Sequence, residues 1–307
     1  MNRKISFRLF LAIPFLLGSL IITILLGYFF YQDEQQEIDN IANLSMKRLN
    51  VRVVQKLNKY LQNAHQINRL NIAAVKSGTI NLKNLNQLHR YLILQLFETK
   101  SVTTVLFGTP QGEFRIVHQV SSDDFGVNTY LRPEELPYEA AISKANAPSI
   151  NKVYSVNEAG DLVREIETVV NIDVRDRPWY RRAAESGKPG WTKPFQISST
   201  NLLGINAYTP LYNSREQLQG VFSVNLSLHQ IEDFLETQLA DEDGEVFIIE
   251  RNGFLIANSF NEPSYVTSKF IFDLSQKNPV TQPEKIQFQR LSVYRSSNPR
   301  MRETLAI

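Results

Sequence analysis

The residues from Gln32 to about Gly78 have the pattern of one long helix. Residues from Leu9 to Tyr31 carry no charge, and no glycine or proline interrupts the residues from Gln32 to Ser77. Apolar side chains then repeat at alternating spacings of four and three, which is typical of a packed helical seam. This seam consists of Val53, Leu57, Tyr60, Ala64 and Ile67. It predicts either a helix that pairs with a second copy of the chain or a helix that packs on its own domain.

Strand and helix patterns alternate through the remaining residues. We expect strand pairs at 102–107 with 114–120, 152–155 with 162–173, 203–212 with 219–226, and 245–250 with 254–258. We expect helices at 82–98, from Pro178 onward, at 229–240 and from about 301, and a loop-rich region at 121–150. The alternation in the 203–226 pair predicts a sheet with one buried face. Together the elements predict an α+β fold built on an antiparallel sheet with flanking helices.

The uncharged segment from Leu9 to Tyr31 is long enough to cross a bilayer, since about 20 apolar residues suffice. Basic residues precede it and acidic residues follow it: Arg3, Lys4 and Arg8 before, Asp33, Glu34 and Glu37 after. The positive-inside rule therefore predicts a single-pass protein of the inner membrane, with a cytoplasmic N-terminus and extracytoplasmic residues after 31. A cleaved signal peptide is the alternative, and the length of the segment favours an uncleaved anchor.

Aromatic and charged residues are concentrated between Asn171 and Phe195. The segment includes Asp173, Arg177, Pro178, Trp179 and Tyr180, and then Gly190-Trp191-Thr192-Lys193-Pro194-Phe195. A strand, a polar corner and a short helix starting at Pro178 are expected here. Arg177 is suited to bind a carboxylate through its fork of donors. The alternative is that both tryptophans are core residues and that Arg177 pairs with Asp173 or Asp176.

These two motifs, Arg177-Pro178-Trp179-Tyr180 and Trp191-Thr192-Lys193-Pro194-Phe195, resemble the signature of double Cache sensor domains. Such domains are the extracytoplasmic ligand-binding regions of bacterial receptors, and the resemblance extends from about Gln32 to the end of the chain. It implies a PAS-like antiparallel-sheet module and a second, partial module. The implied boundaries are 1–31 for the cytoplasmic N-terminus and transmembrane helix, 32–78 for the long helix, 79–240 for the membrane-distal module, and 241–307 for the membrane-proximal module.

In amino-acid-binding members of this family, the arginine and tryptophan of the first motif hold the ligand carboxylate. The resemblance implies the same for Arg177, Trp179 and Tyr180, while Ile172 and Asn225 stand where those members have a tyrosine and an aspartate. Asn225 can accept a hydrogen bond but has no charge to pair with an ammonium group. The candidate ligand-binding residues are Arg177, Trp179, Tyr180, Asn225, Phe195, Asp173 and Tyr208.

Composition and motifs argue against other classes of function. The 307 residues have a net charge of +2, which indicates no nucleic-acid partner, and the absence of cysteine excludes disulfides and thiolate metal sites. The four histidines have no ligand spacing, and no nucleotide-binding or hydrolase motif is present. We therefore expect no enzyme activity, metal or cofactor.

The expected partners are a small molecule such as a carboxylate or an amino acid, the membrane, and a second copy of the chain bound through the long helix. The expected function is the ligand-sensing region of a transmembrane receptor, in truncated form. A ligand-free dimerisation or interaction protein derived from such a receptor is the alternative.

Overall fold

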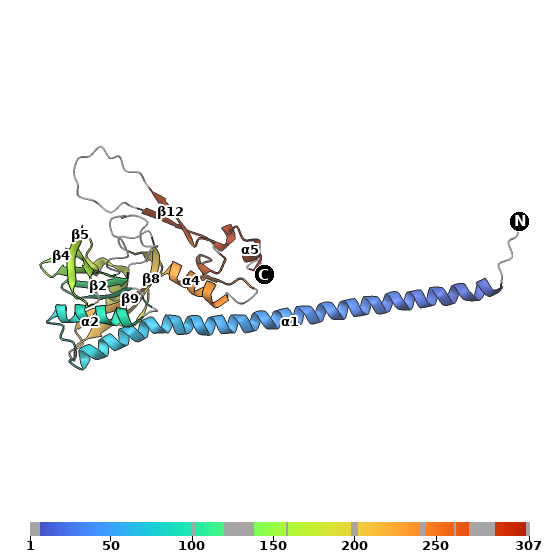
Figure 1. Cartoon of the computed structure of the whole chain (residues 1–307), viewed down its shortest axis with the longest axis horizontal. Coiled ribbons are helices and arrows are strands. Elements are labelled where there is room, and N and C mark those ends of the chain that lie inside the picture. Colours follow the sequence, from blue (N-terminus) through green and yellow to red (C-terminus); the bar gives the residue numbers. More distant parts are fainter. Residues whose placement is uncertain are drawn as a thin grey trace. The chain divides into compact units, whose positions relative to one another are not determined.

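The computed structural model describes residues 7–99, 102, 104–119, 138–157, 159–197, 202–239, 244–260, 262–269 and 286–304 (Figure 1). The helices are α1 (Phe7–Lys76), α2 (Leu85–Glu98), η2 (Val174–Asp176), α3 (Pro178–Ser186), α4 (Leu228–Leu239), η3 (Val293–Arg295) and α5 (Pro299–Thr304). The strands of the main sheet are β1 (Thr104–Gly108), β2 (Phe114–Gln119), β3 (Tyr138–Lys144), β4 (Ala147–Val156), β5 (Leu162–Val170), β6 (Gly190–Trp191), β7 (Phe195–Gln196), β8 (Leu203–Tyr212) and β9 (Leu218–Ser227). The remaining strands are β10 (Phe247–Ile249), β11 (Leu255–Asn258), β12 (Tyr265–Lys269) and β13 (Ile286–Arg290).

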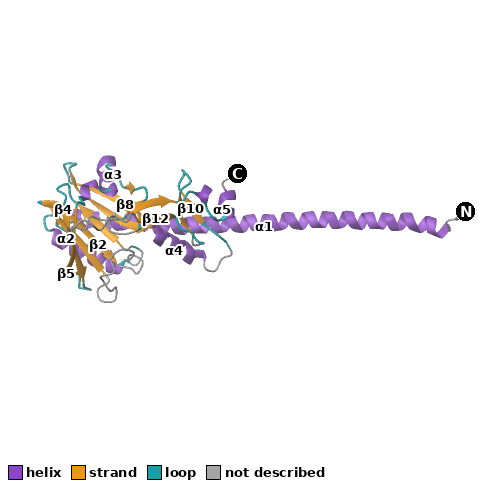
Figure 2. Cartoon of the chain, turned by 90° about the horizontal axis from the view of Figure 1, so that it is seen from above, coloured by secondary structure: helices purple, strands orange, loops and turns teal. Residues whose placement is uncertain are grey.

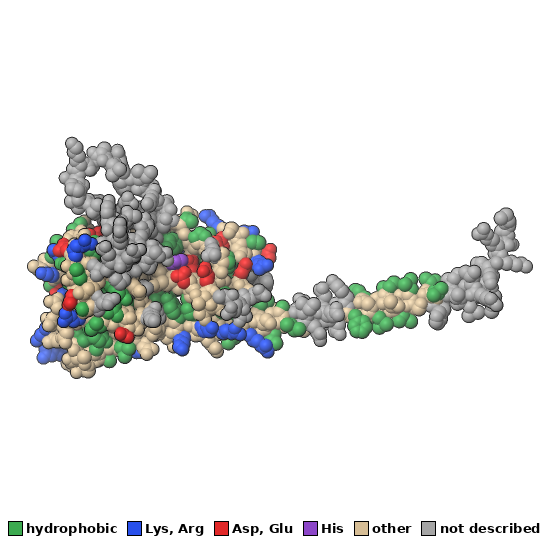
Figure 3. All heavy atoms as spheres, viewed as in Figure 1, with side chains coloured by type: hydrophobic (Ala, Val, Ile, Leu, Met, Phe, Trp, Pro, Cys, Tyr) green, Lys and Arg blue, Asp and Glu red, His purple; other side chains and the backbone are tan. Residues whose placement is uncertain are grey.

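The chain divides into two compact units, residues 1–58 and residues 59–307. In the first unit, residues 16–30 of α1 expose most of their large apolar side chains (Figure 3). Within the described residues, none of the helices is apolar over enough of its length to cross a membrane. The transmembrane segment and the four domain boundaries stay predictions.

The main sheet of the second unit is antiparallel, with strand order β5-β4-β3-β2-β1-β9-β8-β6 and with β7 also paired to β8 (Figure 2). The predicted hairpins β1–β2, β4–β5 and β8–β9 are confirmed. The loop expected at 121–150 is wrong for its second half, because β3 pairs with both β2 and β4. Residues 120–137 lie outside the described part. Pro148, one of the prolines on which the loop prediction rested, stands at the start of β4 beside a turn, where a strand tolerates a proline.

The C-terminal part of α1 and all of α2 cover one face of this sheet. The helix predicted at 82–98 is confirmed as α2, and its stripe of Leu85, Leu88, Leu92 and Leu96 is buried. Ala64 and Ile67 of α1 join this stripe in a core with Phe107, Phe222 and Val224. The Tyr60 ring stacks on that of Phe234, with centroids 4.9 Å apart. The seam residues from Tyr60 to Ile67 thus pack on their own domain, as one of the two alternatives predicted. Dimerisation stays a prediction.

The opposite face of the sheet is also buried, under α3 and η2. Trp179, Tyr180 and Ala183 pack on Leu106 and Val221 of the central strands. The expectation of a single buried face for β8 and β9 is therefore wrong, since nearly every residue of these two strands is buried. Helices cover both faces, and the small alternating polar residues of β8 and β9 lie inside the domain.

Residues 244–304 form a smaller group of elements after α4. The hairpin β10–β11 has the predicted turn, and β12–β13 is a second hairpin. A bridge between Phe254 and Ser292 joins the two hairpins, and Leu255, Val293 and Met301 form a small core beneath α5. The predicted hairpin at 245–258 and the predicted C-terminal helix are both confirmed.

Candidate ligand-binding site

The segment that follows β5 forms the predicted polar corner and short helix. Asn171 leaves the strand with a φ of 65°, in the left-handed region that asparagine tolerates better than most residues. Pro178 occupies the first turn of α3, where its missing donor costs nothing. Gly187 ends the helix in the left-handed conformation, with a φ of 64°. Arg177 is therefore placed by local chain geometry at the N-cap of α3.

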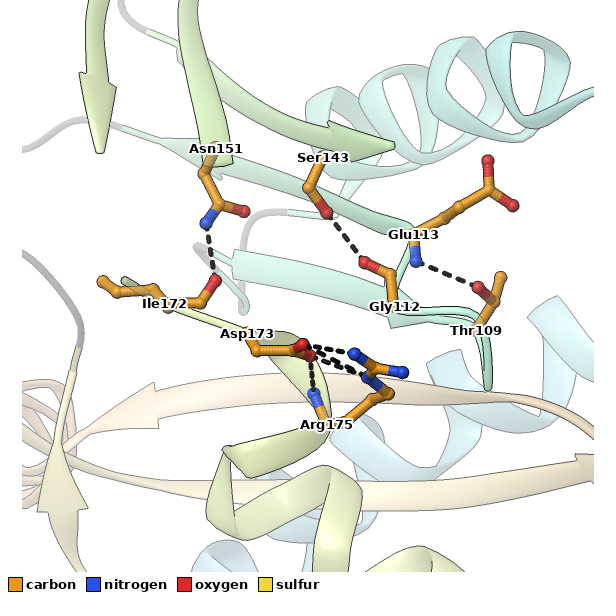
Figure 4. A network of polar contacts seen from close by, with 8 residues as sticks. All are labelled: Thr109, Gly112, Glu113, Ser143, Asn151, Ile172, Asp173 and Arg175. Carbon is orange, nitrogen blue, oxygen red and sulfur yellow. Dashed lines mark hydrogen bonds and ion pairs between the residues drawn. The ribbon is translucent and has the colours of Figure 1, made fainter. Parts of the chain in front are cut away.

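A polar network ties this corner to the sheet (Figure 4). Asn151 Nδ2 donates to the carbonyl of Ile172 over 2.7 Å. The Asp173 carboxylate caps η2 by accepting from the Arg175 amide over 2.9 Å, and Arg175 Nη2 donates to it over 2.6 Å. The Arg175 hydrogen bond is the main reason that the pKa of Asp173 lies below its ordinary value. Asp173 is therefore committed to Arg175, and the alternative in which it pairs with Arg177 is wrong.

Trp179 and Tyr180 are nearly fully buried, so the interpretation of Trp179 as a core anchor is confirmed. Gly108 of β1 makes this packing possible, because a Cβ there would lie 2.7 Å from Val174 Cγ2 and 3.2 Å from the Trp179 ring. Burial raises the pKa of Tyr180 to about 12, which keeps its hydroxyl protonated and able to donate. Trp191 is only partly buried and meets the His65 ring edge-on at 5.0 Å.

Arg177 has a different environment from its neighbouring arginines. Its Nη2 donates to the carbonyl of Gln196 over 3.1 Å, and its Cζ lies 5.5 Å from the centre of the Phe195 ring. Burial lowers the pKa of this guanidinium. No carboxylate contacts Arg177 in the part of the chain that the structure describes. A partly buried positive charge with one backbone acceptor and one aromatic ring retains unused donors.

The two candidate residues on the sheet, Asn225 and Tyr208, lie on the face that α3 covers. Tyr208 packs in the aromatic cluster of Trp179 and Tyr180. Asn225 is paired across the strands with Thr104 of β1 and Asn206 of β8. Phe195 is paired with Gly204, two residues along β8 from Asn206.

Because a strand rises about 3.4 Å per residue, the Phe195 end of the site lies about 7 Å along the strand from the Asn225 row. Arg177, Phe195 and Asn225 therefore share one face, and Asp173 belongs to the corner network.

Sequence reasoning missed several polar residues on this face, namely Thr104, His118, Asn206 and Ser223. Thr104 Oγ1 and His118 Nδ1 lie 2.7 Å apart, and Asn225 Nδ2 donates to Asn206 Oδ1 over 2.7 Å. The signal was present in the alternation of Val221-Phe222-Ser223-Val224-Asn225, which places Ser223 and Asn225 on the same face. A buried strand with polar residues at alternate positions indicates either an internal hydrogen-bond network or a binding face.

Comparison with known proteins identifies the domain type. Residues 116–233 match the family model of the methyl-accepting chemotaxis protein-like, first PDC sensor domain. Among curated proteins, none matches the chain.

Solved structures similar to this chain include Methyl-accepting Chemotaxis protein X, with 13% identity, a TM-score of 0.46, and coverage of 72% of this chain and 75% of that one. The sensory domain of the Campylobacter jejuni chemoreceptor Tlp3 has 11% identity, a TM-score of 0.42 and coverage of 69% of each chain. The ligand-binding domain of the Pseudomonas fluorescens chemoreceptor CtaA, in complex with L-leucine, has 15% identity, a TM-score of 0.40 and coverage of 66% and 63%.

The family match spans β2 to α4 and includes Arg177, Trp179, Tyr180 and Asn225. It confirms the resemblance to receptor sensor domains that the two aromatic motifs predicted. Residues 116–233 are thus similar to the first PDC sensor domain of methyl-accepting chemotaxis protein-like proteins.

Proposed function

We propose that this chain is the extracytoplasmic sensing region of a transmembrane receptor, and that its first module binds a small carboxylate through Arg177. The proposal gives the chain a binding role and assigns it no reaction. The family match supports a sensory role for residues 116–233. The choice of a carboxylate rests on the environment of Arg177.

The proposal rests on the partly buried Arg177 guanidinium, which has hydrogen-bond donors without an acceptor among the described residues. Removing a charge from water is costly unless an opposite charge or several hydrogen bonds compensate it. Among the residues that the structure describes, the compensation consists of the Gln196 carbonyl and the Phe195 ring. A ligand carboxylate would complete it with a charge-assisted, two-point contact. The neighbouring Asp173 cannot serve, since Arg175 already binds it.

Membrane attachment is part of the same proposal. The uncharged segment from Leu9 to Tyr31, with its basic and acidic flanks, is suited to anchor the sensing region. A ligand that binds two arrangements of the domain with different affinity would shift the population between them and so transmit a signal.

A thermal-shift screen of the purified chain tests the ligand class. The panel would contain small monocarboxylates, amino acids, amines and purines at equal concentrations. We expect carboxylate-bearing compounds to raise the melting temperature, because mass action stabilises a domain that binds them. Stabilisation by amines or purines alone, or by no compound in the panel, would contradict the proposed ligand class.

A further inference from the structure

Asn206 connects the residues on the ligand-facing side of the sheet. It is fully buried, and every polar group it has is used. Its amide nitrogen donates to Thr192 Oγ1 over 2.9 Å, and its carbonyl accepts from the Thr192 amide over 3.0 Å. Its side-chain Nδ2 donates to Ser223 Oγ over 2.8 Å, and its Oδ1 accepts from Asn225 Nδ2 over 2.7 Å. Two hydrogen bonds therefore hold this side chain in one orientation, and two more hold its backbone.

The orientation of Asn206 determines that of Asn225. Asn206 presents Oδ1 to Asn225, so Asn225 must present Nδ2 in return. Ser223 Oγ is in turn 3.2 Å from the carbonyl of Ala207, to which it donates, so it accepts from Asn206 and does not compete for Asn225. The Oδ1 of Asn225 accepts no hydrogen bond from a described residue. Asn225 therefore leaves its Oδ1 acceptor for a ligand, together with the second hydrogen of Nδ2.

The cross-strand neighbours of Asn225 are Thr104 and Asn206, and neither carries a charge. Thr104 Oγ1 is already engaged with His118 Nδ1 at 2.7 Å. An amide oxygen in a buried, neutral row can accept from a hydroxyl without a large desolvation cost. An ammonium ion placed there would lose its hydration without gaining an opposite charge.

We propose that Asn206 is a positioning residue that holds Asn225 Oδ1 toward the ligand. The site then selects a carboxylate that bears a neutral hydrogen-bond donor, namely a hydroxy acid, over the corresponding amino acid. This inference rests on the proposed carboxylate site at Arg177. It adds the second group of the ligand, and it names a residue that touches no ligand atom. Arg177 and Asn225 then recognise two ends of one small molecule.

Matched triads of compounds test the selection directly. Each triad has hydrogen, hydroxyl or ammonium on the carbon next to the carboxylate: propionate, L-lactate and L-alanine, and 4-methylvalerate, L-2-hydroxy-4-methylvalerate and L-leucine. Dissociation constants for the full chain would be measured by calorimetry. We expect the hydroxy acid to bind about 5- to 10-fold more tightly than the deoxy acid, because one additional hydrogen bond contributes about that much to the affinity. The amino acid is expected to bind more weakly than the hydroxy acid.

Variants separate positioning from general damage to the fold. Asn206→Ala removes the acceptor that holds Asn225. We expect the hydroxy acid and the deoxy acid then to bind about equally, while weak carboxylate binding remains. Asn225→Asp adds a charge and should move the preference to the amino acid. Thr209→Val, on the same strand, replaces a buried hydroxyl that has no partner among the described residues and serves as the control.

The outcomes distinguish the two proposals. Carboxylate binding that requires Arg177 but shows no hydroxyl preference, or a preference for the amino acid in the wild type, would overturn this inference alone. The inference would also fail if Asn206→Ala keeps the preference while the chain stays folded. Failure of every triad to bind the wild type would overturn both proposals.

Discussion

Acidification is expected to destabilise the domain that contains α2 through His89 on that helix. This side chain is 5% exposed, and neither ring nitrogen has a partner among the described residues. Burial, and then repulsion from Arg115, lowers its pKa from 6.5 to about 4. The folded domain therefore holds His89 neutral, whereas the unfolded chain takes up a proton as the pH falls below 6.5. Stability conferred by the neutral form is present above that value and is lost progressively toward pH 4.

The size of the effect follows from the two pKa values. Between pH 8 and pH 5, His89 alone should lower the free energy of unfolding by about 2 kcal/mol. Urea unfolding followed by tryptophan fluorescence measures this, because Trp179 and Trp191 both belong to the domain that contains α2. His89→Leu should remove most of the decrease. It should also raise stability at pH 8, since the two buried nitrogens of the ring are lost.

His229→Gln is the control, because that side chain is 44% exposed and lies on α4. It should keep the acid-dependent decrease. If the wild type and His89→Leu lose the same free energy between pH 8 and pH 5, His89 is not buried in its neutral form and the reasoning is wrong.

Two further substitutions test the packing on each side of the sheet. Gly108→Ala should destabilise the domain by about 1–3 kcal/mol, because the new methyl group would lie 2.7 Å from Val174 Cγ2 and displace the corner that holds Arg177. An unchanged free energy of unfolding in urea would refute this prediction. Asn71→Leu on α1 should stabilise the domain by about 1 kcal/mol, because both polar atoms of the Asn71 side chain are buried without partners among the described residues. A loss of stability in Asn71→Leu would show that the Asn71 amide makes a stabilising hydrogen bond, and it would contradict this prediction.

Local patterns predicted the elements whose signals lie within a few residues. The leucine stripe at Leu85, Leu88, Leu92 and Leu96 defined α2, and the proline at position 178 defined the start of α3. Each signal reflects a local cause, either helical spacing or the missing donor of proline. The aromatic motif also identified the segment that forms the candidate site.

Features that depend on distant partners escaped prediction. Tyr138–Lys144 is a strand because β2 and β4 flank it on both sides, and no pattern within the segment reports those neighbours. Tyr60, Ala64 and Ile67 show the same spacing whether the helix meets a second copy or its own sheet. Asn206 became a candidate only when the register placed it beside Asn225.

The role of Arg177 in binding a carboxylate is the central claim, and calorimetry on matched variants tests it most directly. Arg181 is an exposed arginine on the same helix, so Arg181→Ala controls for charge and for helix stability. For a carboxylate that stabilises the wild type, we predict that the dissociation constant rises 10- to 100-fold in Arg177→Ala. This rise corresponds to a loss of roughly 1.5–3 kcal/mol of binding free energy. Arg181→Ala should bind as the wild type does. Equal affinity in a folded Arg177→Ala variant would contradict the assigned site.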